Sequence, residues 1–294
     1  MNSVVQPVVV GVDGSPPSQQ ALQWAAKAAM ARDLPLAILY ASQFAGTADA
    51  YEYVSLEAEE AGQQLLSKAE AEVKDRFPDL ACSTEFAHEN PASALVDASR
   101  QAALVIVGNR GHGGFHDLLL GSTSLHTAMH AHCPVAVIRP TSTEEQGAAG
   151  RIVVGVDASV PSQAALRLAF AEASLTGRPV TAVHAFTSAL TAYPPALMPQ
   201  VSDLKADRDR ARDLLARELL PWQAEHPDIE VDTVIVQGDA SWALVQYSQG
   251  AHLVVVGSRG LGGFAGLIFG SVGHALIHHA GCPVLIARDT DDSQ

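Results

Sequence analysis

The sequence of 294 residues contains few cysteines, few lysines and no long apolar run. Its three cysteines lack Cys-x-x-Cys spacing, which argues against a disulfide framework and against a cysteine-rich zinc site. Because the sequence has only four lysines, a phosphate site here cannot rely on lysine. No apolar stretch approaches the roughly 18 residues that span a bilayer, and the N-terminus lacks the basic region and cleavage site of a signal peptide. A cytoplasmic protein without a membrane span is therefore expected.

Basic residues are outnumbered by acidic ones, 18 to 32, so the formal net charge is −14 at pH 7. Nucleic acids and anionic membranes carry negative charge and would be repelled. Neither is expected as a partner.

The sequence contains an internal duplication. VVVGVDGSPPSQQAL, beginning at Val8, matches IVVGVDASVPSQAAL, beginning at Ile152. LVIVGNRGHGGF, beginning at Leu104, matches LVVVGSRGLGGF, beginning at Leu253. A repeat of this length indicates two homologous domains. We expect them at residues 1–140 and 151–294, joined by a polar linker at 141–150.

Apolar runs typical of buried strands alternate with helical patterns in each repeat. In the first repeat, strands are expected near 7–12, 35–41, 81–86, 104–107 and 134–138, and helices near 16–31, 51–76, 91–101 and 122–130. Parallel strands need helical crossovers, so this order predicts an α/β fold with a doubly wound parallel sheet in each tandem domain. Ser15 is expected to cap the first helix. We also expect a pseudo-two-fold axis through the last strands of the two domains, where a sheet edge would otherwise be exposed.

A glycine-rich loop follows the fourth strand of each repeat. GNRGHGGFHDLLLGST, from Gly108, recurs as GSRGLGGFAGLIFGSV, from Gly257, with the spacing G-x(2)-G-x(9)-G-S in both. Glycines let backbone N–H groups approach an anion, and Gly-Ser at a helix start adds further donors and the positive end of the helix dipole. Ligands of doubly wound sheets bind at this edge. The loops therefore predict two phosphate sites.

Neither loop is one of the common phosphate-binding motifs. The P-loop lysine is absent from both copies, and GVDGS after the first strand lacks the G-x-G-x-x-G dinucleotide fingerprint. Phosphate charge must then be balanced by backbone amides, by Arg110 and Arg259, and by a divalent ion.

With these motifs, the sequence resembles the ATP-binding branch of the universal stress protein family, in its tandem, actinobacterial form. The resemblance covers roughly residues 5–140 and 150–289. It implies Rossmann-like domains of the adenine nucleotide α-hydrolase type, two ATP molecules per chain with Mg²⁺, and a role in stress adaptation. A homodimer and a protein partner of unknown identity are expected with it.

The resemblance also implies the contact residues. It places phosphates and ribose at the glycine loop and helix start, adenine at the ends of the first two strands, and a carboxylate, Asp13 or Asp157, beside the ribose or Mg²⁺. In the first repeat the implied residues are Gly11, Val12, Asp13, Ala41, Gly108, Asn109, Arg110, Gly111, His112, Gly113, Gly114, Gly121, Ser122, Thr123 and Ser124. In the second they are Gly155, Val156, Asp157, Ala185, Gly257, Ser258, Arg259, Gly260, Leu261, Gly262, Gly263, Gly270, Ser271 and Val272.

Two of these patterns have plainer interpretations. Asp13 and Asp157 could cap the turn that follows them. An H-x(3)-H-x-H-C pattern from His126 has the spacing of metal ligands, but the second repeat does not reproduce it. Histidines in the last turn of a helix also interact favourably with its negative end, so no direct metal site is expected.

No nucleophile–base pair and no paired carboxylates occur in the motifs, so no catalytic residue is expected. A nucleotide-dependent sensor or regulator is the favoured interpretation. A slow ATPase, or another ATP-using enzyme of the same superfamily, is the alternative. A scaffold in which nucleotide only stabilises the fold is a third.

Overall fold

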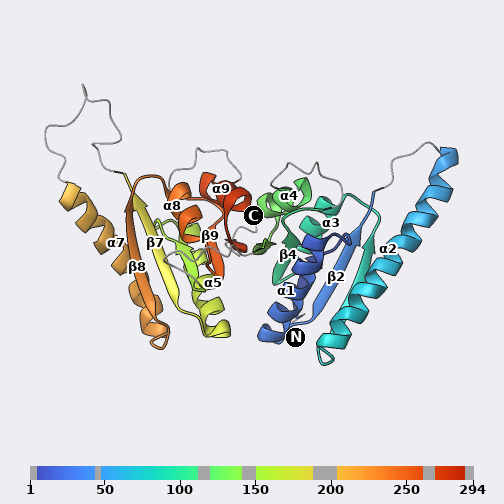
Figure 1. Ribbon diagram of the computed structural model, residues 1–294, viewed down its shortest axis with the longest axis horizontal. Helices are drawn as coiled ribbons and strands as arrows, with labels where there is room; N and C mark the ends of the chain where they lie inside the picture. Colours follow the sequence, from blue (N-terminus) through green and yellow to red (C-terminus); the bar gives the residue numbers. More distant parts are fainter. Residues whose placement is uncertain are drawn as a thin grey trace, which may run out of the picture. The chain divides into compact units, whose positions relative to one another are not determined.

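The computed structural model describes residues 5–43, 48–111, 120–140, 150–187, 204–260 and 269–288. The chain divides into two compact units, Met1–Arg139 and Pro140–Gln294, each with helices on both faces of a sheet (Figure 1). Among the helices in the described ranges, none combines the length and apolar character needed to cross a membrane.

The first unit is a doubly wound parallel sheet. Its elements are β1 (Val8–Gly11), α1 (Pro16–Arg32), β2 (Leu36–Ala41), α2 (Ala48–Arg76), β3 (Cys82–Ala87), α3 (Pro91–Ala98), β4 (Leu104–Gly108), α4 (Ser122–His130) and β5 (Val135–Ile138). The strands pair in parallel in the order β3-β2-β1-β4-β5. Helices α1 and α2 pack on one face, and α3 and α4 on the other. The strand order reverses between β1 and β4, which confirms the predicted fold.

The second unit repeats this architecture. Its elements are β6 (Ile152–Gly155), α5 (Val160–Thr176), β7 (Val180–Phe186), α7 (Leu204–Glu225), β8 (Val231–Gln237), α8 (Ala240–Tyr247), β9 (Leu253–Gly257), α9 (Ser271–His279) and β10 (Val284–Ala287). The strands pair in parallel in the order β8-β7-β6-β9-β10. The reversal of strand order lies between β6 and β9.

Burial of the strands follows their position in the sheet. In β1 and β4, Val8–Val10 and Leu104–Val107 are buried because helices cover both faces, as their unbroken apolar runs predict. Ser83, Thr84 and Glu85 of the outer strand β3 are exposed. The apolar core therefore lies on both faces of the central strands, between the sheet and its helices. The glycine loops follow the ends of these strands.

The helix boundaries follow local capping. The Ser15 hydroxyl accepts a hydrogen bond from Ser18 N–H at 3.3 Å, so the expected N-cap of α1 is confirmed. Helix α3 ends at Ala98, three residues before the expected Gln101. There, the Ser99 hydroxyl donates to the Val96 carbonyl at 2.5 Å, and tight turns replace the helix.

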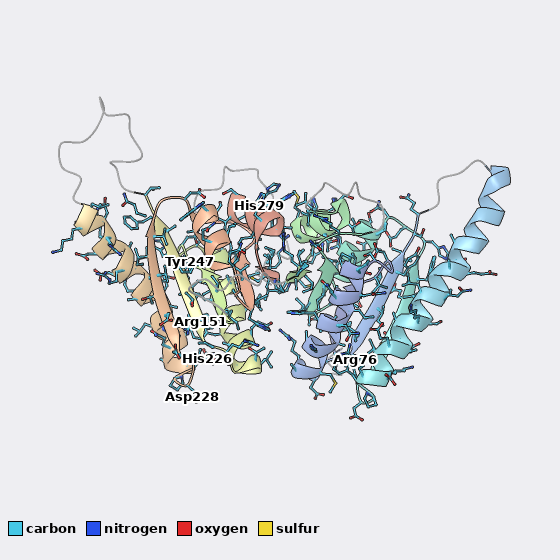
Figure 2. The ribbon with its side chains drawn as sticks, in the orientation of Figure 1. Arg76, Arg151, His226, Asp228, Tyr247 and His279 are labelled. Atoms are coloured by element: carbon cyan, nitrogen blue, oxygen red, sulfur yellow. The ribbon has the colours of Figure 1, made fainter. Side chains whose placement is uncertain are left out.

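Arg151, labelled in Figure 2, directly precedes β6 at the edge where the strands of the second unit begin, and its side chain contacts residues of β7 and β8. Its side chain is 14% exposed; it donates to Thr181 Oγ1 at 2.9 Å and pairs with Glu230 at 2.8 Å and with Asp232 at 3.1 Å. Nearby, burial and the charge of Arg178 lower the pKa of His252 to about 4, so this histidine is neutral at pH 7. These contacts lie at the opposite edge of the sheet from the glycine loop.

Candidate functional site

Each unit contains a cleft at the carboxyl edge of its sheet, at the reversal of strand order. The first cleft has a volume of about 730 Å³ and the second about 450 Å³. Their walls are the ends of the first two strands, the start of the third helix of the fold (α3 or α8), the described part of the glycine loop and the start of α4 or α9. This is the position in which doubly wound sheets bind ligands.

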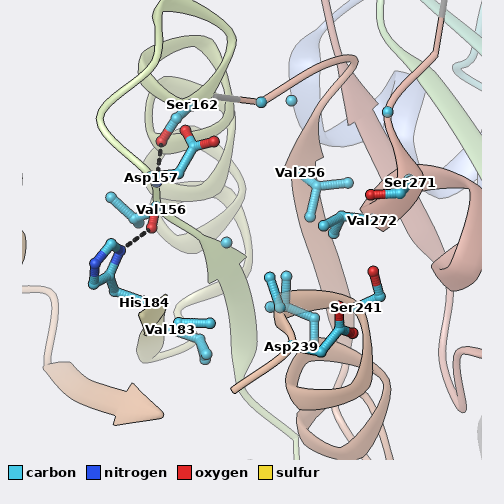
Figure 3. Close-up of a pocket in the computed structure, with 18 of the residues that line it drawn as sticks. Val156, Asp157, Ser162, Val183, His184, Asp239, Ser241, Val256, Ser271 and Val272 are labelled. Atoms are coloured by element: carbon cyan, nitrogen blue, oxygen red, sulfur yellow. Dashed lines mark hydrogen bonds between the residues drawn. The ribbon is translucent and has the colours of Figure 1, made fainter. Parts of the chain in front are cut away.

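Most of the residues implied by the sequence line these clefts. In the first they are Gly11, Val12, Asp13, Ala41, Gly108, Arg110, Gly111, Gly121, Ser122, Thr123 and Ser124. In the second, shown in Figure 3, they are Gly155, Val156, Asp157, Ala185, Gly257, Arg259, Gly260, Gly270, Ser271 and Val272. The expected contacts His112, Gly113, Gly114, Leu261, Gly262 and Gly263 lie outside the described residues.

Two expected contact residues, Asn109 and Ser258, do not line the clefts. Both are buried, and their backbones hold the ends of the glycine loop. Asn109 N–H donates to the Ile138 carbonyl at 2.9 Å, and the Asn109 carbonyl accepts from Gly121 N–H at 2.9 Å. The Ser258 carbonyl accepts from Gly270 N–H in the same way. These two residues shape the loop, whereas their neighbours face the cleft.

Asp13 and Asp157 each use one carboxylate oxygen to stabilise the turn before the first helix of the unit. Asp13 Oδ1 accepts the N–H of Ser15 at 2.9 Å and its hydroxyl at 2.6 Å, and Asp157 Oδ1 accepts from Ser159 at 3.0 and 2.6 Å. The other oxygen faces the glycine loop: a Cβ at Gly260 would stand 2.5 Å from Asp157 Oδ2, and a Cβ at Gly111 would overlap Asp13 Oδ2. The turn interpretation is therefore confirmed for one oxygen of each carboxylate, and the other oxygen lies against the glycine loop at the cleft.

Close packing requires glycine at positions 108 and 257. A Cβ at Gly108 would lie 2.8 Å from the backbone of Pro17, and one at Gly257 would lie 2.7 Å from the backbone of Pro161. The base of the loop thus sits directly against the first turn of α1 or α5. The sequence motif gives no indication of this contact, because the two segments are about 90 residues apart.

The start of the third helix also lines each cleft, and the sequence interpretation missed it. Pro91 and Leu95 contribute in the first cleft, and Asp239, Ser241 and Leu244 in the second. Every strand-to-helix turn of such a sheet emerges at the same edge, so this turn could have been included on topology alone.

His184 lines the second cleft as well, with Nδ1 at 2.7 Å from the Val156 carbonyl. It occupies the position of Tyr40 in the first unit, whose ring instead lies 5.4 Å from that of Phe86. This exchange makes the wall of the second cleft more polar.

The side chains suit an ion that arrives with phosphates better than a metal held by protein alone. Beside each glycine loop lie one carboxylate and one arginine, Asp13 with Arg110 and Asp157 with Arg259. Mg²⁺ requires six oxygen ligands and commonly takes several from phosphate and water. Within the described ranges, no three His, Cys, Asp or Glu side chains are grouped to hold a metal.

Comparison with known proteins places both units in one family. The family model described as "Universal stress protein family" matches residues 5–139 and 149–288. Universal stress protein Rv2005c of Mycobacterium tuberculosis is 36% identical over 96% of this chain and 97% of its own length. The crystal structure of a universal stress protein from Archaeoglobus fulgidus covers 98% of this chain and 99% of its own, with a TM-score of 0.65 and 21% identity. A universal stress protein in complex with cAMP, 28% identical, aligns with 47% of this chain and 99% of its own at a TM-score of 0.38.

Proposed function

This chain belongs to the universal stress protein family, and from that premise we propose that each of its clefts binds one ATP molecule with Mg²⁺. The observation that best supports this proposal is that the same cleft occurs in both units. In each cleft, spaced glycines, a helix start and an Asp–Arg pair lie where the strand order reverses.

The lining residues supply a recognition chemistry for each part of the nucleotide. Backbone N–H groups of the loop, the hydroxyl of Ser122 or Ser271 and the arginine bind the phosphates, because a helix start and a cation both favour negative charge. The outward oxygen of Asp13 or Asp157 accepts from a ribose hydroxyl or binds the ion. Adenine occupies the apolar slot at the ends of the first two strands, beside Leu95 or Leu244.

The biological role that follows is that of a cytoplasmic regulator whose stability or partner surface changes with bound nucleotide. It acts as a homodimer on a protein partner of unknown identity. None of the residues given a role here activates water at the γ-phosphate, so turnover is not part of the proposed function.

The first test is stoichiometry. Isothermal titration of the full chain with ATP and Mg²⁺ should saturate at two nucleotides per chain, because both copies of the motif are intact. Zero binding would end the proposal, and saturation at one would mean that one cleft has lost the function.

The second test separates a regulator from an enzyme. ATP that binds only the folded state should stabilise each unit by about 2.7 kcal/mol at a hundredfold excess over Kd. For units of this size the melting temperature should then rise by roughly 5–10 °C.

A non-hydrolysable ATP analogue should give nearly the same rise in melting temperature, with hydrolysis far below the ~10 s⁻¹ of a typical enzyme. If ATP is turned over in seconds while the analogue fails to stabilise the protein, the enzyme interpretation replaces this one.

A further inference from the structure

The two clefts differ at the helix start that faces the ligand. In the first, Thr123 follows Ser122 at the start of α4, and in the second, Val272 follows Ser271 at the start of α9. Threonine and valine have nearly the same shape, so the exchange replaces a hydroxyl donor by a methyl group without changing the wall. The second helix start therefore offers one donor fewer to a phosphate.

The next position along the helix changes the support of the loop. The Ser124 hydroxyl, which is buried, donates to the Gly108 carbonyl at 2.6 Å and ties the start of the loop to α4. The second unit has Gly273 there, and the ring of Phe269 occupies the space: a Cβ at Gly273 would lie 2.8 Å from Phe269 Cζ. The loop of the second unit is thus not tied to its helix by a serine at this position.

At the start of the third helix, by contrast, the second cleft carries polar side chains that the first cleft lacks. The first unit has Asn90 and Ala92 at the start of this helix. The second unit has Asp239 and Ser241 at the matching positions, and these two residues line the second cleft (Figure 3). Asp239 caps α8, accepting the N–H of Trp242 at 2.7 Å. A carboxylate and a hydroxyl suit ribose hydroxyls or a base amino group, which donate hydrogen bonds, whereas a carboxylate repels phosphate.

The second cleft is also the smaller of the two, at about 450 Å³ against about 730 Å³ for the first. From these differences we infer that both clefts accept ATP but differ in preference. The first binds the nucleoside triphosphate more tightly than the monophosphate, and the second binds the monophosphate more tightly than the triphosphate. This inference rests on the proposed function, ATP binding at both clefts. The chain would then bind the triphosphate and the monophosphate at the same time and respond to the ratio of their concentrations.

The experiment is titration of the full chain with ATP and with AMP, in variants that isolate each cleft. Gly260→Ala weakens nucleotide binding at the second cleft, so titration of this variant measures the first cleft. Gly111→Ala weakens binding at the first cleft, so its titration measures the second. The first cleft should bind ATP at least about tenfold more tightly than AMP, because a charge-assisted hydrogen bond contributes about that factor. The second should bind AMP more tightly than ATP.

Matched exchanges assign the preference to the side chains. Thr123→Val should lower ATP affinity of the first cleft about tenfold, and Val272→Thr should raise that of the second by a similar factor, with AMP affected less. Asp239→Asn preserves a residue able to cap α8 while removing the charge, so it should raise ATP affinity of the second cleft and weaken AMP binding.

The outcomes are distinguishable. If neither ATP nor AMP binds the unaltered chain, the proposed function fails and the inference fails with it. If both clefts bind adenine nucleotides with the same order of preference, or if the Thr123 and Val272 exchanges leave the preference unchanged, only the inference is overturned.

Discussion

Gly111→Ala should lower the nucleotide affinity of the first cleft roughly ten- to hundredfold while leaving the fold and the second cleft intact. The new Cβ would overlap Asp13 Oδ2, and Asp13 cannot simply turn away, because its other oxygen accepts two hydrogen bonds from Ser15. Either the loop or the carboxylate must shift, so the phosphate contacts and the Asp13 contact are no longer aligned. Gly260→Ala should act on the second cleft through Asp157 in the same way.

Gly121→Ala, at another glycine that lines the same cleft, should lower the nucleotide affinity less than Gly111→Ala does. Its Cβ would have its nearest neighbour, the Arg110 Cα, at 3.6 Å, an ordinary contact, so the loop can accept it. Each variant is titrated with ATP and Mg²⁺, and circular dichroism checks that the fold is retained. Loss of both sites after one substitution would contradict two independent clefts, and unchanged affinity in Gly111→Ala would contradict a role for the Asp13–Gly111 contact.

Gly108→Ala should have its largest effect on stability, lowering the free energy of unfolding of the first unit by about 3 kcal/mol. The Cβ would stand 2.8 Å from the backbone carbonyl group of Pro17, and backbone in the first turn of a helix cannot rotate out of the way as a side chain can. Gly257→Ala should destabilise the second unit likewise, against Pro161.

Urea unfolding measures this effect, with probes that follow each unit separately, since the two units need not unfold in one transition. Gly111→Ala is the comparison: its obstacle is a side-chain carboxylate, so its cost in stability should stay within about 1 kcal/mol. Equal destabilisation by the Gly108 and Gly111 variants would show that the loop glycines are not divided between packing and binding.

The sequence determined the fold and the approximate place of the site. Unbroken apolar runs such as LVIV mark strands covered on both faces, Ser15 and Pro16 mark the start of α1, and these signals are local, so they can be read without a structure. The duplicated glycine spacing located both clefts, because the edge from which a strand-to-helix loop emerges follows from the parallel topology alone.

Only the tertiary structure decided which atoms the individual side chains contact. Gly108 must be glycine because Pro17 lies against it, Asp13 turns one oxygen to Ser15 and the other to Gly111, and Phe269 fills the space above Gly273. The polar wall of Asp239 and Ser241 comes from a third segment of the second unit. Each of these contacts joins residues whose positions depend on packing between elements, and neither the period nor the spacing of a motif encodes which atoms will meet there.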